Sequence, residues 1–304
     1  MNTETNFDLP TWQQERYKKL EIEGRPEYKY CFHGTAAKNL PVILNKGFSF
    51  REGRPSVSVS ASYSLGWTDP KMLIDKKRLY TSDVATDQNG QIVNPENEGI
   101  LLVIESKKFK PYPINDGFPI KINNETFTRG RWHNFHNILA NPNKEIIPEN
   151  QINLDPNEVK LALKPTKEFA SILADFRNEL FHGQLKKDDY SQLLNNYFHK
   201  KDVAVIDRIS DKKELINNIL DGEVEKFIVE TIRKSMLSIM TLSGENIYVG
   251  GEKKPFKPWS KDKISECIVS LTKLAPQITN KLMQTNITKS ILVLNQELTK
   301  IENS

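Results

Sequence analysis

The sequence has little cysteine, little net charge and no long apolar run, and each shortage excludes a class of protein. Two cysteines, Cys31 and Cys267, occur among 304 residues, too few for a disulfide-rich scaffold or a four-cysteine zinc site. The 43 lysines and arginines nearly balance 39 aspartates and glutamates, so the chain is not a polycationic tail, and nucleic acid is not an expected partner. No stretch reaches the ~18 apolar residues of a membrane span.

The start of the chain has no sign of a targeting segment. Its first 30 residues contain neither an apolar core nor a small-residue cleavage motif, so a classical signal peptide is not expected. The two cysteines are most simply interpreted as reduced thiols. These features predict a cytoplasmic protein.

Residues 28–160 show the patterns of strands, turns and loops. The aromatic run over 28–32 predicts a strand that ends at the tripeptide His33-Gly34-Thr35. Residues 40–47 have the apolar spacing of a helix, with a glycine at the C-cap. The run Gly99–Glu105 is nearly all apolar, as is typical of a central strand. Residues 106–130 are polar and contain turn formers, which predicts loops.

Two more segments of the first half carry potential chemistry. Residues 56–62 alternate serine with small apolar residues, and this period of two predicts a strand with one face of hydroxyl groups. Tyr63 and Trp67 follow it. Glu145 opens the sequence Glu-Ile-Ile-Pro, which predicts a short strand stopped by proline.

The apolar period changes to 3.6 after about residue 165, which predicts a helical bundle. Helices are expected around 169–180, 190–197, 215–220, 224–232 and 260–301, the last broken near Ala275-Pro276. The glycine, proline and lysine residues of 244–258 predict a hairpin or loop. We therefore predict two domains, 1–160 and 161–304. No flexible linker separates them near residue 160, so the helical half should pack against the first half.

The order of these segments resembles the ADP-ribosyltransferase superfamily. In that family the first strand carries His or Arg, often followed by Gly, a second core strand carries Ser or Tyr, and a late strand begins with Glu. The matching positions here are His33-Gly34, the serines of 56–62, and Glu145; the helix that ends in Gly47-Phe48 is also similar. The resemblance covers roughly residues 28–155. It implies an α+β fold with a split β-sheet core followed by an α-helical domain.

The resemblance also implies an activity, mono-ADP-ribosyl transfer with NAD as the substrate. Glu145 would stabilise the oxocarbenium-like transition state, as a carboxylate does in glycoside hydrolysis. His33 would anchor the adenosine ribose, and the Gly34 backbone would hold the nicotinamide carboxamide. Ser58 and Ser60 are further catalytic candidates, whose hydroxyls would position the ribose and Glu145, with the choice between them left open. Thr35, Tyr63 and Trp67 would bind NAD, and Tyr63 or Trp67 could stack on the nicotinamide ring. No metal is expected.

The same resemblance implies a protein acceptor, expected to be a host protein. Asn143 stands where arginine-specific members carry Glu or Gln, so arginine is not favoured as the acceptor. A compact transferase with a helical appendage and no signal peptide suits a bacterial effector or toxin, secreted into a host cell by a non-classical secretion system.

Several alternatives stay open at this stage. The first half could be a catalytically inactive member that binds a partner, with the helical half as an adaptor. A tRNA 2′-phosphotransferase has the same fold and a similar His-Gly-Thr strand. The pair His133 and His136 has metal-ligand spacing but no third ligand nearby, and together with Phe135 could contact the acceptor instead. The lysine-rich residues 253–263 could bind an anionic partner or form a solvated loop.

Overall fold

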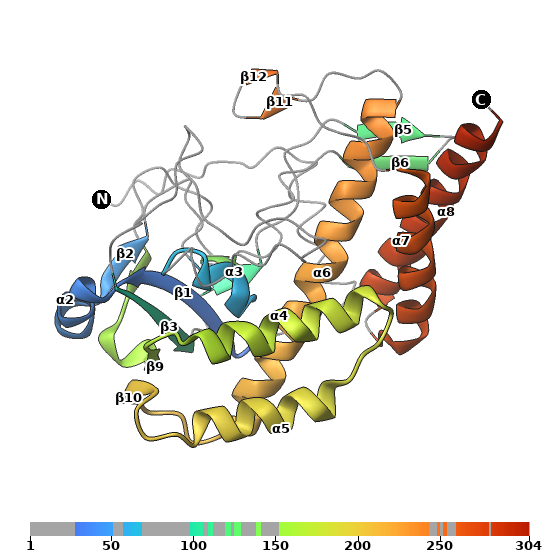
Figure 1. Ribbon diagram of the computed structural model, residues 1–304. Helices are drawn as coiled ribbons and strands as arrows, with labels where there is room; N and C mark the ends of the chain where they lie inside the picture. The colour runs from blue at the N-terminus through green and yellow to red at the C-terminus, as the bar shows by residue number, and fades with distance from the viewer. Residues whose placement is uncertain are drawn as a thin grey trace, which may run out of the picture.

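The protein is an α+β fold in which helices pack on a small antiparallel sheet (Figure 1). The computed structural model describes residues 28–50, 57–68, 98–105, 109–111, 119–122, 125–128, 138–140, 152–242, 248–249, 252–253, 260–279 and 281–303. Within these residues no helix is long and apolar enough to cross a membrane.

Four strands form the main sheet, in the order β1-β3-β9-β10. They are β1 (Tyr30–Ala36), β3 (Gly99–Glu105), β9 (Val159–Leu163) and β10 (Ala204–Asp207). All three pairings are antiparallel. The predicted central strand is confirmed, because β3 lies between β1 and β9 and residues 99–104 are buried. An apolar run suits this position because both faces of the strand are covered.

Short strand pairs accompany the main sheet. They are β2 (Phe48–Phe50) with β8 (Ile152–Leu154), β4 (Phe109–Pro111) with β7 (Ile138–Ala140), β5 (Pro119–Ile122) with β6 (Glu125–Thr128), and β11 (Tyr248–Val249) with β12 (Glu252–Lys253). The predicted hairpin over 244–258 therefore contains a strand pair. The loops predicted over 106–130 are wrong in part, because β4, β5 and β6 lie there. Their β-branched and aromatic residues favour strands despite the polar surroundings.

The helices are α2 (Leu40–Lys46), α3 (Ala61–Leu65), α4 (Lys167–Phe181), α5 (Lys187–Phe198), α6 (Lys212–Leu242), α7 (Lys261–Leu274) and α8 (Lys281–Glu302). All but α3 agree closely with the apolar spacing; α3 begins inside the stretch predicted to be a strand. The predicted break at Ala275-Pro276 is a short 3-10 helix, Ala275–Gln277, since proline lacks the N–H that an α-helix needs there. The two helices expected over 215–232 are one helix, α6, because no residue of that stretch ends it.

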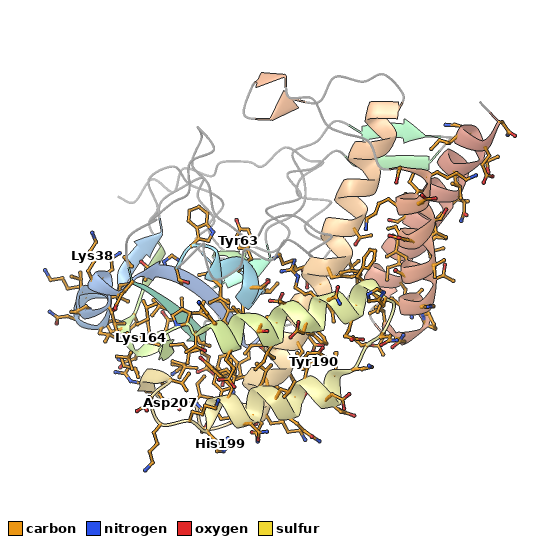
Figure 2. All side chains as sticks on the ribbon, viewed as in Figure 1. Lys38, Tyr63, Lys164, Tyr190, His199 and Asp207 are labelled. Atoms are coloured by element: carbon orange, nitrogen blue, oxygen red, sulfur yellow. The ribbon has the colours of Figure 1, made fainter. Side chains whose placement is uncertain are left out.

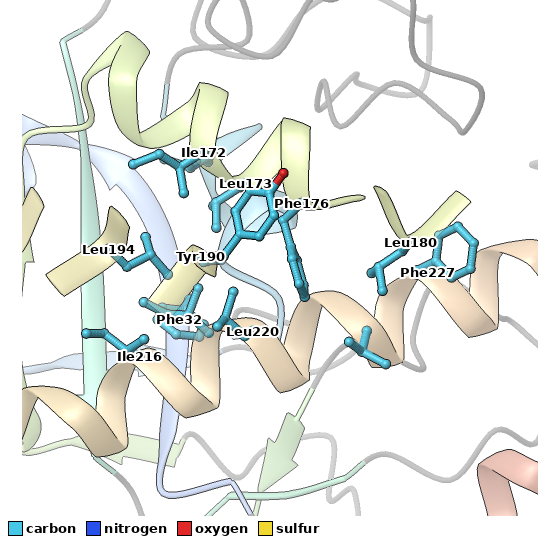
Figure 3. Packing of buried hydrophobic residues seen from close by; sticks show 14 of the residues in the cluster. Phe32, Ile172, Leu173, Phe176, Leu180, Tyr190, Leu194, Ile216, Leu220 and Phe227 are labelled. Carbon is cyan, nitrogen blue, oxygen red and sulfur yellow. The ribbon is translucent and has the colours of Figure 1, made fainter. Parts of the chain in front are cut away.

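Each face of the main sheet has its own core. Phe32, Leu101 and Val103 pack with α3, α4 and α6, and this larger cluster extends to α7 and α8. Figure 3 shows the part of it in which Phe32 lies among residues of α4, α5 and α6. Cys31, Leu102 and Ile104 alternate with those three strand residues and pack with α2 and residues 57–59. The larger cluster joins residues from both halves of the sequence, and the expected boundary at residue 160 falls inside β9. The helical half thus shares a core with the first half.

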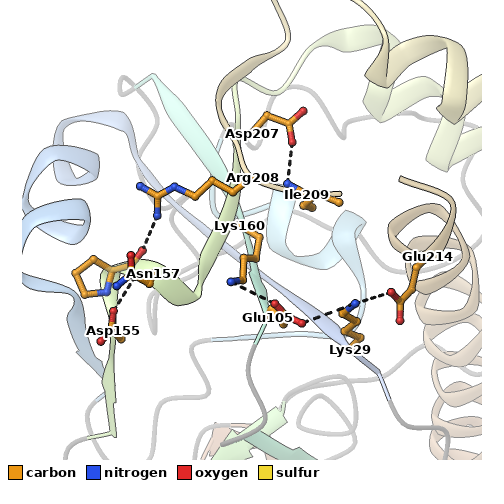
Figure 4. A network of polar contacts seen from close by, with 10 residues as sticks. Lys29, Glu105, Asp155, Asn157, Lys160, Asp207, Arg208, Ile209 and Glu214 are labelled. Atoms are coloured by element: carbon orange, nitrogen blue, oxygen red, sulfur yellow. Dashed lines mark hydrogen bonds and ion pairs between the residues drawn. The ribbon is translucent and has the colours of Figure 1, made fainter. Parts of the chain in front are cut away.

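Helix α6 also contacts the first half through polar groups. Asn218 Oδ1 accepts a hydrogen bond from the Tyr30 backbone N–H (2.9 Å), and Glu225 Oε2 accepts one from Tyr28 Oη (2.5 Å). Lys29 pairs with Glu214 of α6 (2.6 Å), in the polar network that Figure 4 shows around the end of β3. These contacts fix the start of β1 against α6.

Gly222 lets α6 approach the first half at backbone distance. A Cβ atom built on Gly222 would lie 1.9 Å from the carbonyl oxygen of Val59 and 2.8 Å from its carbon. Both atoms belong to the backbone, so they cannot move aside as a flexible side chain would. The helix and residues 57–60 are therefore held in contact only while this position has no side chain.

We predict that Gly222→Ala destabilises the protein, although alanine is the better helix former by about 1 kcal/mol. The clash with Val59 should outweigh that gain, with a loss in the range of about 1–3 kcal/mol typical of overpacking. Urea denaturation measures it. Asn217→Ala is the control, since Asn217 is an exposed residue of the same helix and should gain a few tenths of a kcal/mol. Stabilisation by both substitutions would contradict the close approach.

Candidate functional site

The first part of the candidate site is the middle of β1. The tripeptide His33-Gly34-Thr35 lies inside this strand, not at its end as predicted, because the strand continues to Ala36. Phe32 exchanges two backbone hydrogen bonds with Ser58, of 2.7 and 2.9 Å. Since alternate residues of a strand direct their backbone N–H and C=O to the same edge, those of Gly34 point to the edge where Ser58 pairs with Phe32.

The second part begins where residues 57–60 leave β1. Phe32–Ser58 is an isolated bridge, and Ala61 begins α3. The predicted strand over 56–62 is therefore wrong for the described residues 57–62, apart from the single bridge at Ser58. Ser60 acts as the N-cap of α3, because its Oγ accepts from Tyr63 N (3.1 Å). The residues that follow Ser60 pack closely against Gly34. A Cβ on Gly34 would lie 1.9 Å from the Ser64 carbonyl oxygen and 3.0 Å from Trp67 Cβ.

We call the place where residues 57–60 leave β1 the split. Two of the predicted NAD-binding residues, His33 and Thr35, lie beside it on β1. Cys31, His33 and Thr35 alternate with Phe32 and Gly34, so they face the opposite side of the sheet. His33 and Thr35 are half-buried, and Thr35 Oγ1 accepts from Asn39 Nδ2 (3.0 Å).

Aromatic groups lie on the Gly34 side. Tyr63 and Trp67 are both half-buried residues at α3. Figure 2 places Tyr63 on the side of the protein away from Tyr190 and His199 of the α5 region. The structure thus brings Gly34, Ser58, Ser60, Tyr63 and Trp67 into one neighbourhood.

Serine hydroxyls at the start of α3 contact a buried carboxylate. Glu223 of α6 is 0% exposed, and Ser60 and Ser62 are 0% and 1% exposed. Oε1 of Glu223 accepts from Ser60 Oγ and from Ser62 N, both at 2.9 Å, and Oε2 accepts from Ser62 Oγ at 2.6 Å. Three donors from a three-residue segment therefore converge on one carboxylate.

Two buried cations complete this cluster. Arg177 Nη1 of α4 and Lys226 Nζ of α6 donate to Ser62 Oγ at 3.1 and 3.2 Å. Arg177 is 5% exposed and Lys226 is 0% exposed. Buried charges need partners of opposite sign and hydrogen bonds, and removing one partner of a buried pair costs roughly 3–5 kcal/mol. The cluster therefore fastens α3 to α4 and α6.

The sequence interpretation missed these charged residues, although the sequence carries a signal for them. Glu223 lies four residues after Ile219 and four before Phe227, inside the apolar stripe of α6. Arg177 lies four residues after Leu173, inside the stripe of α4. Opposite charges at core positions of two helices predict a buried pair or network, because an unpaired charge there would be too costly.

Some predicted residues lie outside the described residues. They are Glu145, the candidate catalytic carboxylate, Ser56, and the possible acceptor contacts His133, Phe135 and His136. Most of the lysine-rich segment 253–263 also lies outside them. Among the residues that are described, no group of three or more histidine, cysteine or acidic side chains could hold a metal ion.

Comparison of this chain with protein-family models, with curated proteins and with solved structures finds no match.

Neither cysteine has the surroundings of a nucleophile. Cys31 on β1 and Cys267 on α7 are 2% and 0% exposed, and burial raises the pKa of the Cys31 thiol far above its usual range. Thiolate is the reactive form, so we predict that neither cysteine reacts with a thiol reagent at pH 8 in the folded protein. Both should react in denaturant, which serves as the control. Rapid labelling of Cys31 in the folded protein would contradict this packing.

Proposed function

We propose that this protein is a mono-ADP-ribosyltransferase that transfers ADP-ribose from NAD to a protein acceptor. The observation that supports it most is the split between β1 and residues 57–60. Residues 57–60 pair with β1 at the Phe32–Ser58 bridge and then turn away into α3. The backbone N–H and C=O of Gly34 face the edge of β1 from which these residues turn away, with Tyr63 and Trp67 nearby.

This arrangement suits the nicotinamide end of NAD. A primary carboxamide has one carbonyl oxygen and one NH₂ group, so it can accept from the Gly34 N–H and donate to the Gly34 C=O. An aromatic ring from Tyr63 or Trp67 would stack on the planar nicotinamide. Ser58 and Ser60 are buried beside this edge, and their place is consistent with a structural role in holding it.

The reaction needs a group that stabilises the positive charge of its transition state. When the bond between nicotinamide and ribose breaks, positive charge develops on the ribose C1′ and O4′. A carboxylate close to that sugar lowers the energy of this transition state more than that of bound NAD. Glu145 is assigned this role from its place in the sequence, and His33 is assigned to the adenosine ribose. The electron pair of the broken bond goes to the ring nitrogen, so nicotinamide leaves as a neutral molecule, and a nucleophile of the acceptor protein bonds to C1′ and releases its proton.

The resemblance to ADP-ribosyltransferases that supports this function also supports a role as a secreted protein. We assign the protein to bacterial effectors or toxins that act on a host protein after secretion. The helical half, which shares a core with the sheet, would present the acceptor or cover the site. Binding of NAD without nicotinamide release would favour the alternative, an inactive nucleotide-binding adaptor.

Glu145→Gln is predicted to lower nicotinamide release and transfer by roughly 10²–10³-fold, the usual loss when one transition-state-stabilising group is removed. Glutamine keeps the shape and can accept a hydrogen bond, but lacks the charge that opposes the cation. The affinity for NAD should change far less. Nicotinamide release, transfer to a cell lysate with labelled NAD, and calorimetry measure these three quantities.

Glu105→Gln is the matched control for the carboxylate. Glu105 ends β3 and pairs with Lys160 (3.3 Å) and Lys29 (3.8 Å) at the partly exposed end of the sheet. Its substitution should leave turnover within about twofold, as expected for surface ion pairs. Turnover of Glu145→Gln within a few-fold of the unsubstituted protein would show that Glu145 is not catalytic.

His33→Ala is predicted to weaken NAD binding roughly two- to tenfold, the loss of one neutral hydrogen bond. His199→Ala is its control. His199 is an exposed histidine at the end of α5, where its ring contacts the Asn195 carbonyl of its own helix, and its substitution should not change the affinity. Equal NAD affinity of the two variants in calorimetry would remove His33 from the site.

A further inference from the structure

We infer that Glu223, in the helical half, is a positioning residue for the NAD site. This inference rests on the proposed function and deepens it. Among the described residues, Glu223 hydrogen-bonds to one group assigned to NAD chemistry, Ser60, and it holds the segment that carries Ser60 and Tyr63. Residues 60–62 reach Glu223 through three hydrogen bonds of 2.6–2.9 Å.

The hydroxyl protons show why a carboxylate is needed. Ser60 and Ser62 have one hydroxyl proton each, and both go to Glu223, one to each oxygen. No proton is then left between the two hydroxyls, although they are 3.2 Å apart. With its proton committed, Ser60 Oγ directs its lone pairs elsewhere, and one accepts the Tyr63 N–H. The carboxylate thereby sets the hydroxyl rotamer that caps α3.

The position of α3 also determines what lies against Gly34. The carbonyl of Ser64 in α3, and Trp67 just after the helix, lie so close to Gly34 that no Cβ atom would fit there. Ser64 Oγ also donates to the Phe32 carbonyl (3.0 Å). A shift of the α3 start would therefore move Tyr63 and Trp67 relative to the Gly34 edge. The helical half would in this way set the geometry of a site that lies in the first half.

The test compares two buried carboxylates of the same helix. Glu223→Gln replaces one acceptor oxygen by an NH₂ group, so it cannot accept from all three donors, and it removes the charge near Arg177 and Lys226. Glu225→Gln is the matched control. Glu225 is also 0% exposed, but the hydroxyl that donates to it, Tyr28 Oη, can donate equally well to an amide oxygen.

We expect Glu223→Gln to raise the NAD dissociation constant and the KM for nicotinamide release about tenfold, with kcat within about threefold. Glu225→Gln should leave all three within about twofold. A substitution that only loosens the fold would affect both variants alike. Equal NAD affinity of both variants and the unsubstituted protein, or equal weakening by both, would overturn the positioning role.

Glu223→Asp covers the case in which Glu223→Gln does not fold. It keeps the charge near Arg177 and Lys226 but shortens the side chain by one methylene, so it cannot reach both serines. It should fold, as thermal denaturation can show, and weaken NAD binding about tenfold; unchanged affinity would again overturn the inference. If the unsubstituted protein neither binds NAD nor releases nicotinamide, the proposed function itself is wrong, and the positioning role toward NAD falls with it.

Discussion

The close contact between helix α6 and residues 59–62 is the constraint on which the rest of the structure depends. Gly222 brings the helix backbone against Val59, and Glu223 binds the turn at Ser60 and Ser62. Farther back on the same helix, Asn218 binds the start of β1. One helix from the C-terminal half therefore contacts both β1 and the segment 59–62 that leaves it.

The contact combines two different kinds of stabilisation. The hydrophobic cluster around Phe32 and α4 is non-directional and holds the layers together. The cluster of Glu223, Arg177 and Lys226 adds direction, because charges buried at this depth are stable only with correctly placed partners. The first contribution holds the two halves together, and the second holds Ser60 where it caps α3.

Much of the fold could be predicted from the sequence because its apolar period is regular. The helices over 167–198 and 261–302 and the central strand Gly99–Glu105 follow directly from spacing. The turn at Ser60 could not, because alternation of Ser with Val and Ala fits a strand, and the carboxylate that binds Ser60 Oγ, Glu223, lies 163 residues away in the sequence. The buried charges of α4 and α6 do leave a local signal, since Arg177 and Glu223 lie inside apolar stripes, but the spacing does not say which group each of them binds. Of the candidate site residues, Gly34 and those in 58–67 form one neighbourhood, His33 and Thr35 face the other side of the sheet, and the role of Glu145 rests on the sequence.

The most direct test of the central claim is amide hydrogen exchange with and without NAD, read residue by residue. The Gly34 N–H points to the edge of β1 at the split, whereas the His33 N–H points to β3, so the two amides are an internal pair. We predict that NAD slows exchange at Gly34 and leaves His33 nearly unchanged. Slowing at neither amide, with protection by NAD at positions away from β1 and α3, would contradict the account.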